Sequence, residues 1–221
     1  MIREIAQRLV SVRERIARTG RNPDDIVIVA VTKGFGAETC KAAIEAGLRV
    51  LGENRVHEAK LKMEELPGAE WHLIGHLQTN KVRQAAGSFA LIHSVDSVRL
   101  ATELARADPK QAVLLEINVA REAQKQGVDP DKALEAIEAV SNLLPLHGLM
   151  AMGPTHGDPA PAFTDLRQLR DQAEQRLGKS LPVLSMGMSG DFEAALAAGS
   201  TMLRLGQALF GTATHLTAWA R

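Results

Sequence analysis

The lysine at position 33 stands where a side-chain amine can become a nucleophile. Lys33 ends the apolar, β-branched run IVIVAVTK at residues 26–33. A lysine that is desolvated at the end of a buried strand has a lowered pKa and can form a Schiff base with an aldehyde. A surface lysine at the start of a loop, with its amine in water, is the alternative. The run alone does not decide between them.

A second concentration of chemistry lies closer to the end of the sequence. The segment SGD that begins at Ser189 precedes a helix expected to start near Phe192. The first amides of a helix have no partner within it and can bind an anion, although Asp191 is also expected to cap them. The next apolar run ends in Arg204, a charged N–H donor, and Gly206, which permits close backbone approach. Together these residues predict a site for a phosphate-bearing ligand.

The histidines do not form the pattern of a metal site. His72 and His76 are four residues apart, but they flank a predicted strand end and a glycine turn rather than lie on one helix. We therefore expect no bound metal. His93 is expected to be a hydrogen-bonded histidine of the core or rim. The single cysteine, Cys40, excludes an intramolecular disulfide and a cysteine zinc site, and is expected to be buried in a helix.

The elements that would position these side chains follow one another in a regular order. Short apolar runs alternate with stretches whose apolar residues recur at helical spacing. We expect strands at 26–33, 48–52, 70–75, 90–96, 112–119, 146–153, 183–187 and 201–206. We expect helices at 2–18, 37–46, 54–65, 78–86, 97–107, 130–142, 160–177 and 190–198, and a closing helix at 208–219.

This alternation is typical of parallel strands joined by crossover helices. Eight such units predict a closed (β/α)₈ TIM barrel, with an extra helix at the N-terminus. An open doubly wound sheet is the alternative, but VTKGFGAE has only two of the three glycines of a G-x-G-x-x-G turn. No linker rich in Pro, Gly or Ser divides the sequence, so residues 1–221 are expected to form one domain.

In a barrel of this kind the active site lies at the C-terminal mouth of the strands. The residues at the predicted strand ends are mostly polar, whereas those just upstream are mainly aliphatic. In order, these strand-end residues are Lys33, Glu53 with Asn54, His76, Ser94 with Asp96, Asn118, Met152, Ser189 and Arg204.

The balance of charged residues limits which kinds of partner the protein is expected to bind. The 221 residues contain 26 Lys and Arg against 26 Asp and Glu, which argues against general attraction to nucleic acid or an anionic membrane. No apolar run is long enough to span a bilayer, and the first 20 residues alternate charged and apolar side chains, unlike a signal peptide. A cytoplasmic protein is therefore expected.

Seven stretches of the sequence, in order, resemble the pyridoxal phosphate homeostasis proteins. They are AVTK (30–33), LGENRVHEAKLK (51–62), WHLIGHLQTNK (71–81), HSVDS (93–97), INVAREAQKQGV (117–128), GLMAMGP (148–154) and LSMGMSGDFEAALAAGSTMLRLGQALFG (184–211). Two positions depart from the family pattern: Gly34 stands where a threonine is common, and Phe192 stands where methionine is usual. Neither is the proposed Schiff-base residue.

The resemblance implies a barrel like the N-terminal domain of alanine racemase, with pyridoxal 5′-phosphate (PLP) bound as a Schiff base to Lys33. It implies that Ser189 and the backbone at Gly206 and Gln207 hold the phosphate. Arg204 would face the pyridine nitrogen. Four further residues would lie near the cofactor or form the pocket wall: Asn54, Asn80, Met152 and His76.

The implied function is to buffer or deliver PLP inside the cell with little or no catalysis. An arginine does not give up its proton, so the ring nitrogen beside Arg204 would stay unprotonated and the ring would be a poor electron sink. A racemase of this barrel type takes a second base from a tyrosine in a separate domain, and this sequence has no tyrosine.

Two alternatives remain open, namely a weak racemase-like PLP enzyme and a phosphate-binding barrel without aldehyde chemistry. Apo forms of PLP-dependent enzymes are the expected protein partners. A monomer is expected, because the second domain of the racemase, which forms much of its dimer interface, is missing.

Overall fold

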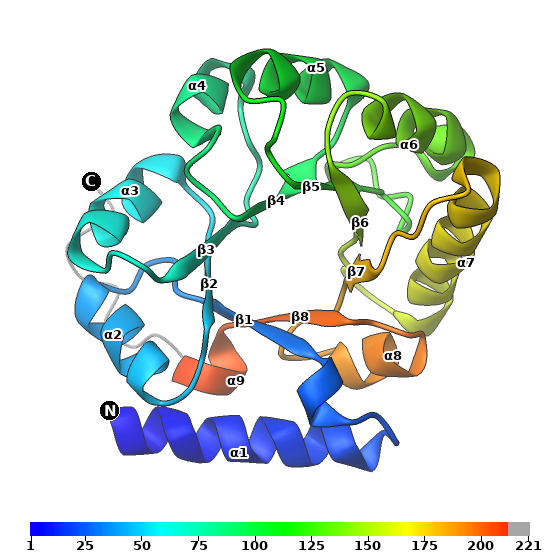
Figure 1. Cartoon of the computed structure of the whole chain (residues 1–221). Helices are drawn as coiled ribbons and strands as arrows, with labels where there is room; N and C mark the ends of the chain where they lie inside the picture. Colours follow the sequence, from blue (N-terminus) through cyan, green and yellow to red (C-terminus); the bar gives the residue numbers. More distant parts are fainter. Residues whose placement is uncertain (212–221) are drawn as a thin grey trace.

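A computed structural model shows a closed barrel of eight parallel strands in the order of the sequence, and it describes residues 1–211 (Figure 1). The (β/α)₈ prediction is therefore confirmed, and the open doubly wound sheet is wrong. The strands are β1 Val27–Val31, β2 Val50–Glu53, β3 Glu70–Leu73, β4 Leu91–Val95, β5 Val113–Glu116, β6 Leu146–Met150, β7 Val183–Ser185 and β8 Met202–Leu205. The barrel closes through pairing of β1 with β8, where Val29 lies opposite Arg204.

Helices follow the strands and form the outer ring seen in Figure 1. They are α2 Ala37–Glu45, α3 Val56–Glu65, α4 Val82–Ala85, α5 Val98–Ala107, α6 Ala133–Ser141, α7 Ala160–Leu177, α8 Phe192–Ala197 and α9 Gln207–Phe210. Local sequence fixes several of their ends. The hydroxyl of Ser97 accepts a hydrogen bond from the Leu100 amide at the start of α5, and Gly178 ends α7 in the left-handed conformation.

The extra N-terminal helix is α1 Ile2–Arg18, as predicted, and it lies across the outside of the ring (Figure 1). Its buried side chains Ile5, Val12 and Ile16 recur at helical spacing and form the face that packs on the barrel. Next to this face, Arg15 is 2.6 Å from Glu193 of α8 and lies over the ring of Phe192.

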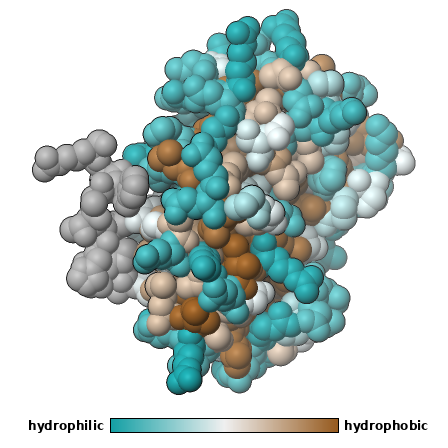
Figure 2. All heavy atoms as spheres, turned by 60° about the vertical axis from the view of Figure 1, so that its left-hand side comes forward, coloured by the Kyte–Doolittle hydropathy of each residue, from teal (hydrophilic) through white to brown (hydrophobic). Residues whose placement is uncertain are grey.

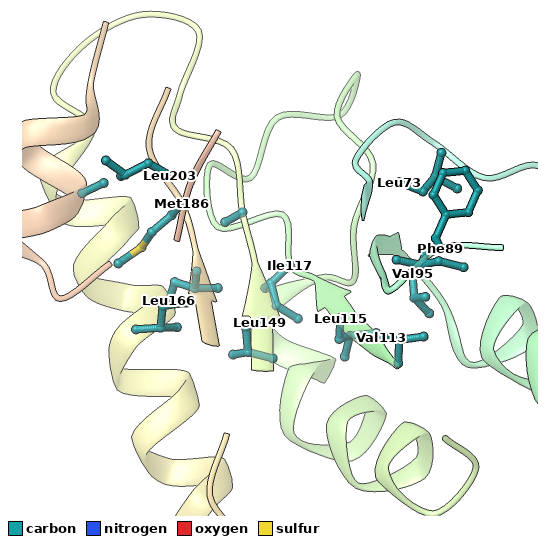
Figure 3. Close-up of a cluster of buried hydrophobic side chains, with 14 of the residues drawn as sticks. Leu73, Phe89, Val95, Val113, Leu115, Ile117, Leu149, Leu166, Met186 and Leu203 are labelled. Carbon is teal, nitrogen blue, oxygen red and sulfur yellow. The ribbon is translucent and has the colours of Figure 1, made fainter. Parts of the chain in front are cut away.

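The side chains of the strands point alternately into the barrel and toward the helices, and they form two apolar cores. A small cluster inside the barrel contains Val29, Val50, Leu91, Leu114, Met150 and Met202. A much larger cluster fills the space between strands and helices, where Leu149 of β6 and Leu166 of α7 are completely buried (Figure 3). Because a strand's side chains alternate, each strand contributes to both layers.

The elements differ from the predictions mainly at the mouth. The predicted helix at 78–86 is a 3₁₀ turn, Thr79–Lys81, followed by the single turn of α4. The predicted strand at 112–119 ends at Glu116, after which Ile117 makes only an isolated bridge to Val128. Of the predicted closing helix at 208–219, α9 covers the first part, and residues 212–221 lie outside the described part of the chain.

The described surface is largely hydrophilic, with apolar side chains in patches between polar ones on the face shown in Figure 2. Three of the exposed large apolar residues, Met1, Ile2 and Val10, lie at the start of α1 or on it, and the others lie on different elements: Val27, Ile44, Leu61, Val98 and Met188. Within residues 1–211, no helix has the length and hydropathy needed to cross a membrane.

Candidate functional site

Lys33 lies two residues beyond the end of β1, at the C-terminal mouth of the barrel. The preceding residue, Thr32, is buried and faces the helix layer, so the alternation of the chain directs Lys33 to the opposite side. The Lys33 side chain is exposed. Of the two alternatives left open by the sequence, the structure has the exposed amine, because β1 ends before Lys33 and the chain turns at Gly34, which has a positive φ.

A buried ion pair between α3 and β2 contacts Thr32, the residue that follows β1. The Lys62 amine of α3 is 2.5 Å from the Glu53 carboxylate of β2 and donates to the Thr32 carbonyl at 3.0 Å. The Thr32 hydroxyl also donates to this carboxylate, at 2.6 Å. Burial raises the pKa of Glu53, although Lys62 acts against this shift. Sequence reasoning missed Lys62, because a lysine on an amphipathic helix usually belongs to the solvated face.

Three predicted phosphate residues come together between β7 and α9. The Ser189 hydroxyl, in the loop after β7, accepts a hydrogen bond of 3.0 Å from the Ala208 amide in α9. Gly206 and Gln207 form the N-terminus of that helix. Asp191 stands at the N-cap of α8, but its carboxylate accepts from the Met188 amide at 2.6 Å and makes no cap hydrogen bond to the helix. The predicted cap is therefore wrong, since the loop amide is its partner.

Arg204 of β8 is buried, and its guanidinium donates hydrogen bonds through its two terminal nitrogens. Its Nη1 donates to the Ser185 carbonyl at 2.6 Å and to the Ser185 hydroxyl at 2.8 Å, and its Nη2 donates to the Ala151 carbonyl at 2.9 Å. A guanidinium has five N–H donors, so the Nε–H and one Nη2–H make no hydrogen bond within the described residues. Burial lowers the Arg204 pKa to about 10, which still leaves the side chain charged at neutral pH.

The remaining predicted residues lie along the mouth loops. His76 is half-exposed, and its Nδ1 is 3.1 Å from the Asp96 carboxylate. Asn54 packs closely against Gly75 in the loop after β3, where a Cβ added to the glycine would lie 2.4 Å from the Asn54 carbonyl oxygen. Asn80 is exposed in the 3₁₀ turn, and Met152 is half-buried after β6. No described hydrogen bond joins the side chains of these four predicted residues to one another.

Sequence reasoning did not single out Glu116, the last residue of β5. Its side chain faces the barrel interior and is almost completely buried. Burial raises its pKa to about 7, with Asp96 adding to the shift and the Arg204 charge opposing it. A carboxyl group that titrates near neutral pH at the mouth of a barrel is a candidate acid or base.

This shift predicts a pH-dependent stability. Between the ordinary pKa of 4.5 and about 7, the unfolded chain loses the Glu116 proton while the folded chain keeps it, so the free energy of unfolding falls as pH rises. The expected loss is about 3 kcal/mol. Glu116→Gln should remove this part of the slope, as measured by denaturant unfolding across the window, whereas the exposed Glu135→Gln should keep it. An unchanged slope in Glu116→Gln would contradict the prediction.

The barrel interior also holds two histidines in contact. His93 is buried, as predicted, and its Nε2 is 2.9 Å from His72 Nδ1, while its Nδ1 is 3.0 Å from the Ser185 hydroxyl. Within residues 1–211, no group of three or more His, Cys, Asp or Glu side chains is arranged to hold a metal ion.

Comparison with known proteins gives consistent matches. The family described as alanine racemase, N-terminal domain, matches residues 4–214. A pyridoxal phosphate homeostasis protein of Aquifex aeolicus is 40% identical over 220 residues, covering 93% of this chain and 96% of the relative. The protein of the same name from Escherichia coli K12 is 39% identical over 231 residues, covering 94% and 96%.

Solved structures show the same similarity. PipY of Synechococcus elongatus, in the structure described as having PLP bound, has a TM-score of 0.82 and 34% identity, covering 94% of this chain and all of that one. An alanine racemase of Clostridium difficile has a TM-score of 0.79 at 14% identity, and the match covers 98% of this chain and 59% of the racemase. The racemase likeness concerns the fold of its barrel.

Proposed function

The chain belongs to the family of pyridoxal phosphate homeostasis proteins, and on this premise we propose that it binds PLP and buffers or delivers the cofactor without catalysing a reaction efficiently. One observation carries the proposal. Three kinds of group lie on loops and strand ends at the same mouth of the barrel. They are the amine of Lys33, hydrogen-bond donors for an anion at Ser189, Gly206 and Gln207, and the N–H groups of Arg204 that have no acceptor among the described residues.

The chemistry of these residues fits the cofactor. PLP supplies an aldehyde that bonds reversibly to an amine, a phosphate group, and an aromatic ring nitrogen. In the proposal, Lys33 provides the amine, and the Ser189 hydroxyl with the amides at the start of α9 bind the phosphate. Arg204 directs its free N–H donors to the ring nitrogen. Asn54, Asn80, Met152 and His76 line the pocket, with His76 held by Asp96.

The proposal of weak catalysis rests on Arg204 and on the lack of a tyrosine to act as a second base. Arg204 stays charged, so it would donate a hydrogen bond to the ring nitrogen of bound PLP without protonating it, and the ring would withdraw fewer electrons. Glu116 favours the second candidate, a weak racemase-like enzyme, because its carboxyl titrates near neutral pH at the mouth. We rank this candidate second, since one carboxyl group does not supply bases on both faces of a substrate and the chain has no tyrosine.

The proposal also covers organisation and partners. We propose that residues 1–221 form one domain that works in the cytoplasm as a monomer, and that it passes PLP to apo-enzymes. Apart from the three at α1, the exposed large apolar residues of the described chain lie on different elements, which supports a monomer because a stable dimer interface needs a contiguous patch.

The deciding experiment is covalent trapping. The protein is incubated with PLP, reduced with borohydride and digested, and the labelled peptide is sequenced. We expect one cofactor per chain on Lys33, together with a visible absorbance band before reduction. No band and no label would overturn cofactor binding. Exchange of the α-hydrogen of an amino acid at ordinary enzyme rates would overturn the carrier and favour the enzyme.

A further inference from the structure

Five side chains cross the barrel interior in one hydrogen-bonded series, which we call the interior chain. Its members in order are Arg204, Ser185, His93, His72 and Glu70. The joining distances are 2.8 Å from Arg204 Nη1 to Ser185 Oγ, 3.0 Å from Ser185 Oγ to His93 Nδ1, 2.9 Å from His93 Nε2 to His72 Nδ1, and 3.0 Å from His72 Nε2 to Glu70 Oε1.

The interior chain runs from one end of the barrel to the other. Arg204 lies near the C-terminal mouth, whereas Glu70 is the first residue of β3, at the opposite end. The three members in the middle are buried, and the Glu70 side chain is 52% exposed. The step from His93 to Ser185 crosses the barrel interior, because β4 and β7 are not neighbours in the sheet.

The Arg204 end dictates where the protons lie. A guanidinium only donates, so the Ser185 oxygen accepts from Arg204. The Ser185 hydroxyl can still donate its own proton, and among the described residues its only acceptor is His93 Nδ1. His93 must therefore carry its proton on Nε2 and donate it to His72 Nδ1. His72 in turn carries its proton on Nε2 and donates it to Glu70.

The Glu70 end dictates the same direction independently. If the histidine protons were reversed, the bare lone pair of His72 Nε2 would face the Glu70 carboxylate, acceptor against acceptor, at 3.0 Å. The Ser185 hydroxyl would accept twice and leave its own proton buried without a partner. Only one arrangement satisfies both ends, so all four hydrogen bonds point from the cation to the carboxylate.

The chain requires both imidazoles to be neutral, and their surroundings agree. Burial lowers the pKa of His93 well below its ordinary value, and the Arg204 charge, like any charge on His72, lowers it further. Burial also lowers the pKa of His72, although Glu70 acts in the opposite direction. A second proton on either imidazole would break the series, because on His72 Nδ1 it would face the His93 Nε2–H, and on His93 Nδ1 it would face the Ser185 hydroxyl proton.

We propose that the interior chain positions Arg204, so that Ser185, His93, His72 and Glu70 fix the donor edge that the guanidinium presents at the mouth. Both Nη1 protons are donated to Ser185, which leaves the Nε–H and one Nη2–H without an acceptor among the described residues. Aligned hydrogen bonds polarise one another in a low dielectric, so the remote carboxylate strengthens this hold. The use of that edge toward a ring nitrogen rests on the proposed function.

The first test uses the protein without cofactor. Long-range ¹H–¹⁵N NMR of the imidazoles should show both His72 and His93 as neutral tautomers with the proton on Nε2. A proton on Nδ1 of His93, or a charged imidazole at neutral pH, would overturn the interior chain. Because no PLP is present, this result is independent of whether the protein binds the cofactor.

The second test asks whether a change at Glu70 reaches Arg204. Glu70→Ala removes the acceptor at the exposed end, so the fold should tolerate it. We expect shifts of the His72 and His93 ring nitrogens and of the Arg204 Nε signal, and a fall in PLP affinity of a few-fold. Glu64→Ala, which removes an exposed carboxylate on α3, should change none of these. Shifts confined to His72 would show that Glu70 does not position Arg204.

A third variant separates positioning from general packing. Ser185→Ala should release His93 Nδ1, move the Arg204 Nε signal and weaken PLP binding about tenfold. Ser200 is an equally buried serine of the barrel whose hydroxyl bonds only to backbone carbonyls, so Ser200→Ala should lower stability without moving these signals. Equal effects of the two variants would overturn the proposal. If the NMR signals respond but PLP does not bind at all, the proposed function fails and the interior chain stands.

Discussion

Replacing Lys33 by alanine is expected to reduce borohydride-trapped PLP to background and to abolish the visible absorbance band. The reason is that Lys33 follows the end of β1 at the mouth of the barrel, and no other type of side chain forms the same reversible bond with an aldehyde. The remaining contacts, charge-assisted hydrogen bonds to the phosphate, should hold PLP with an affinity on the order of a millimolar. Equilibrium dialysis and mass spectrometry of the reduced protein measure both quantities.

Two variants make this result specific. Lys33→Arg keeps the positive charge but cannot form the carbon–nitrogen double bond, so it should lose trapping while retaining more of the noncovalent affinity than alanine does. Lys41→Ala removes an exposed lysine of α2 and should trap PLP as the unchanged protein does. Undiminished trapping in Lys33→Ala, with the label on another lysine, would move the site away from β1.

The barrel was predictable because its signals are local and repeated. Short β-branched runs alternate with helical spacing eight times, and each repeat adds evidence for the same parallel arrangement. The strand-end rule then selected polar residues such as Lys33, Ser189 and Arg204, which the structure places at strand ends and the loops that follow them. The strands themselves end earlier than their apolar runs, because hydropathy does not show where a chain leaves the sheet and turns into a loop.

Contacts that depend on the direction of side chains could not be predicted. Ser185 and His93 come from strands that lie across the barrel from each other, and nothing in either local segment reports the partner. The sequence could not decide whether Lys33 is desolvated, and the structure has it exposed, whereas Lys62, in an ordinary amphipathic helix, has its amine buried against Glu53. A run of residues shows how apolar a segment is, but the position of an amine at the end of a flexible side chain depends on the neighbouring elements.

The largest effect on stability is expected from Lys62→Met. The substitution preserves most of the side-chain volume but leaves the Glu53 carboxylate buried without its cation, so the free energy of unfolding near neutral pH should fall by about 3–5 kcal/mol. Lys60→Met, on the same helix, has no such partner among the described residues and should cost much less. Denaturant unfolding of the two variants measures the difference.

The pH dependence and a double variant identify the cause. Without Lys62, burial should raise the Glu53 pKa further above 4.5, so the folded state keeps a proton that the unfolded chain releases, and stability should fall as pH rises through this window. The deficit of Lys62→Met should therefore shrink toward pH 4.5 and below, where Glu53 is neutral in both states. Adding Glu53→Gln removes the unpaired charge and should restore most of the stability near neutral pH. A deficit that is independent of pH and unrelieved by Glu53→Gln would instead assign the loss to the hydrogen bond from Lys62 to the Thr32 carbonyl, which holds the chain just before Lys33.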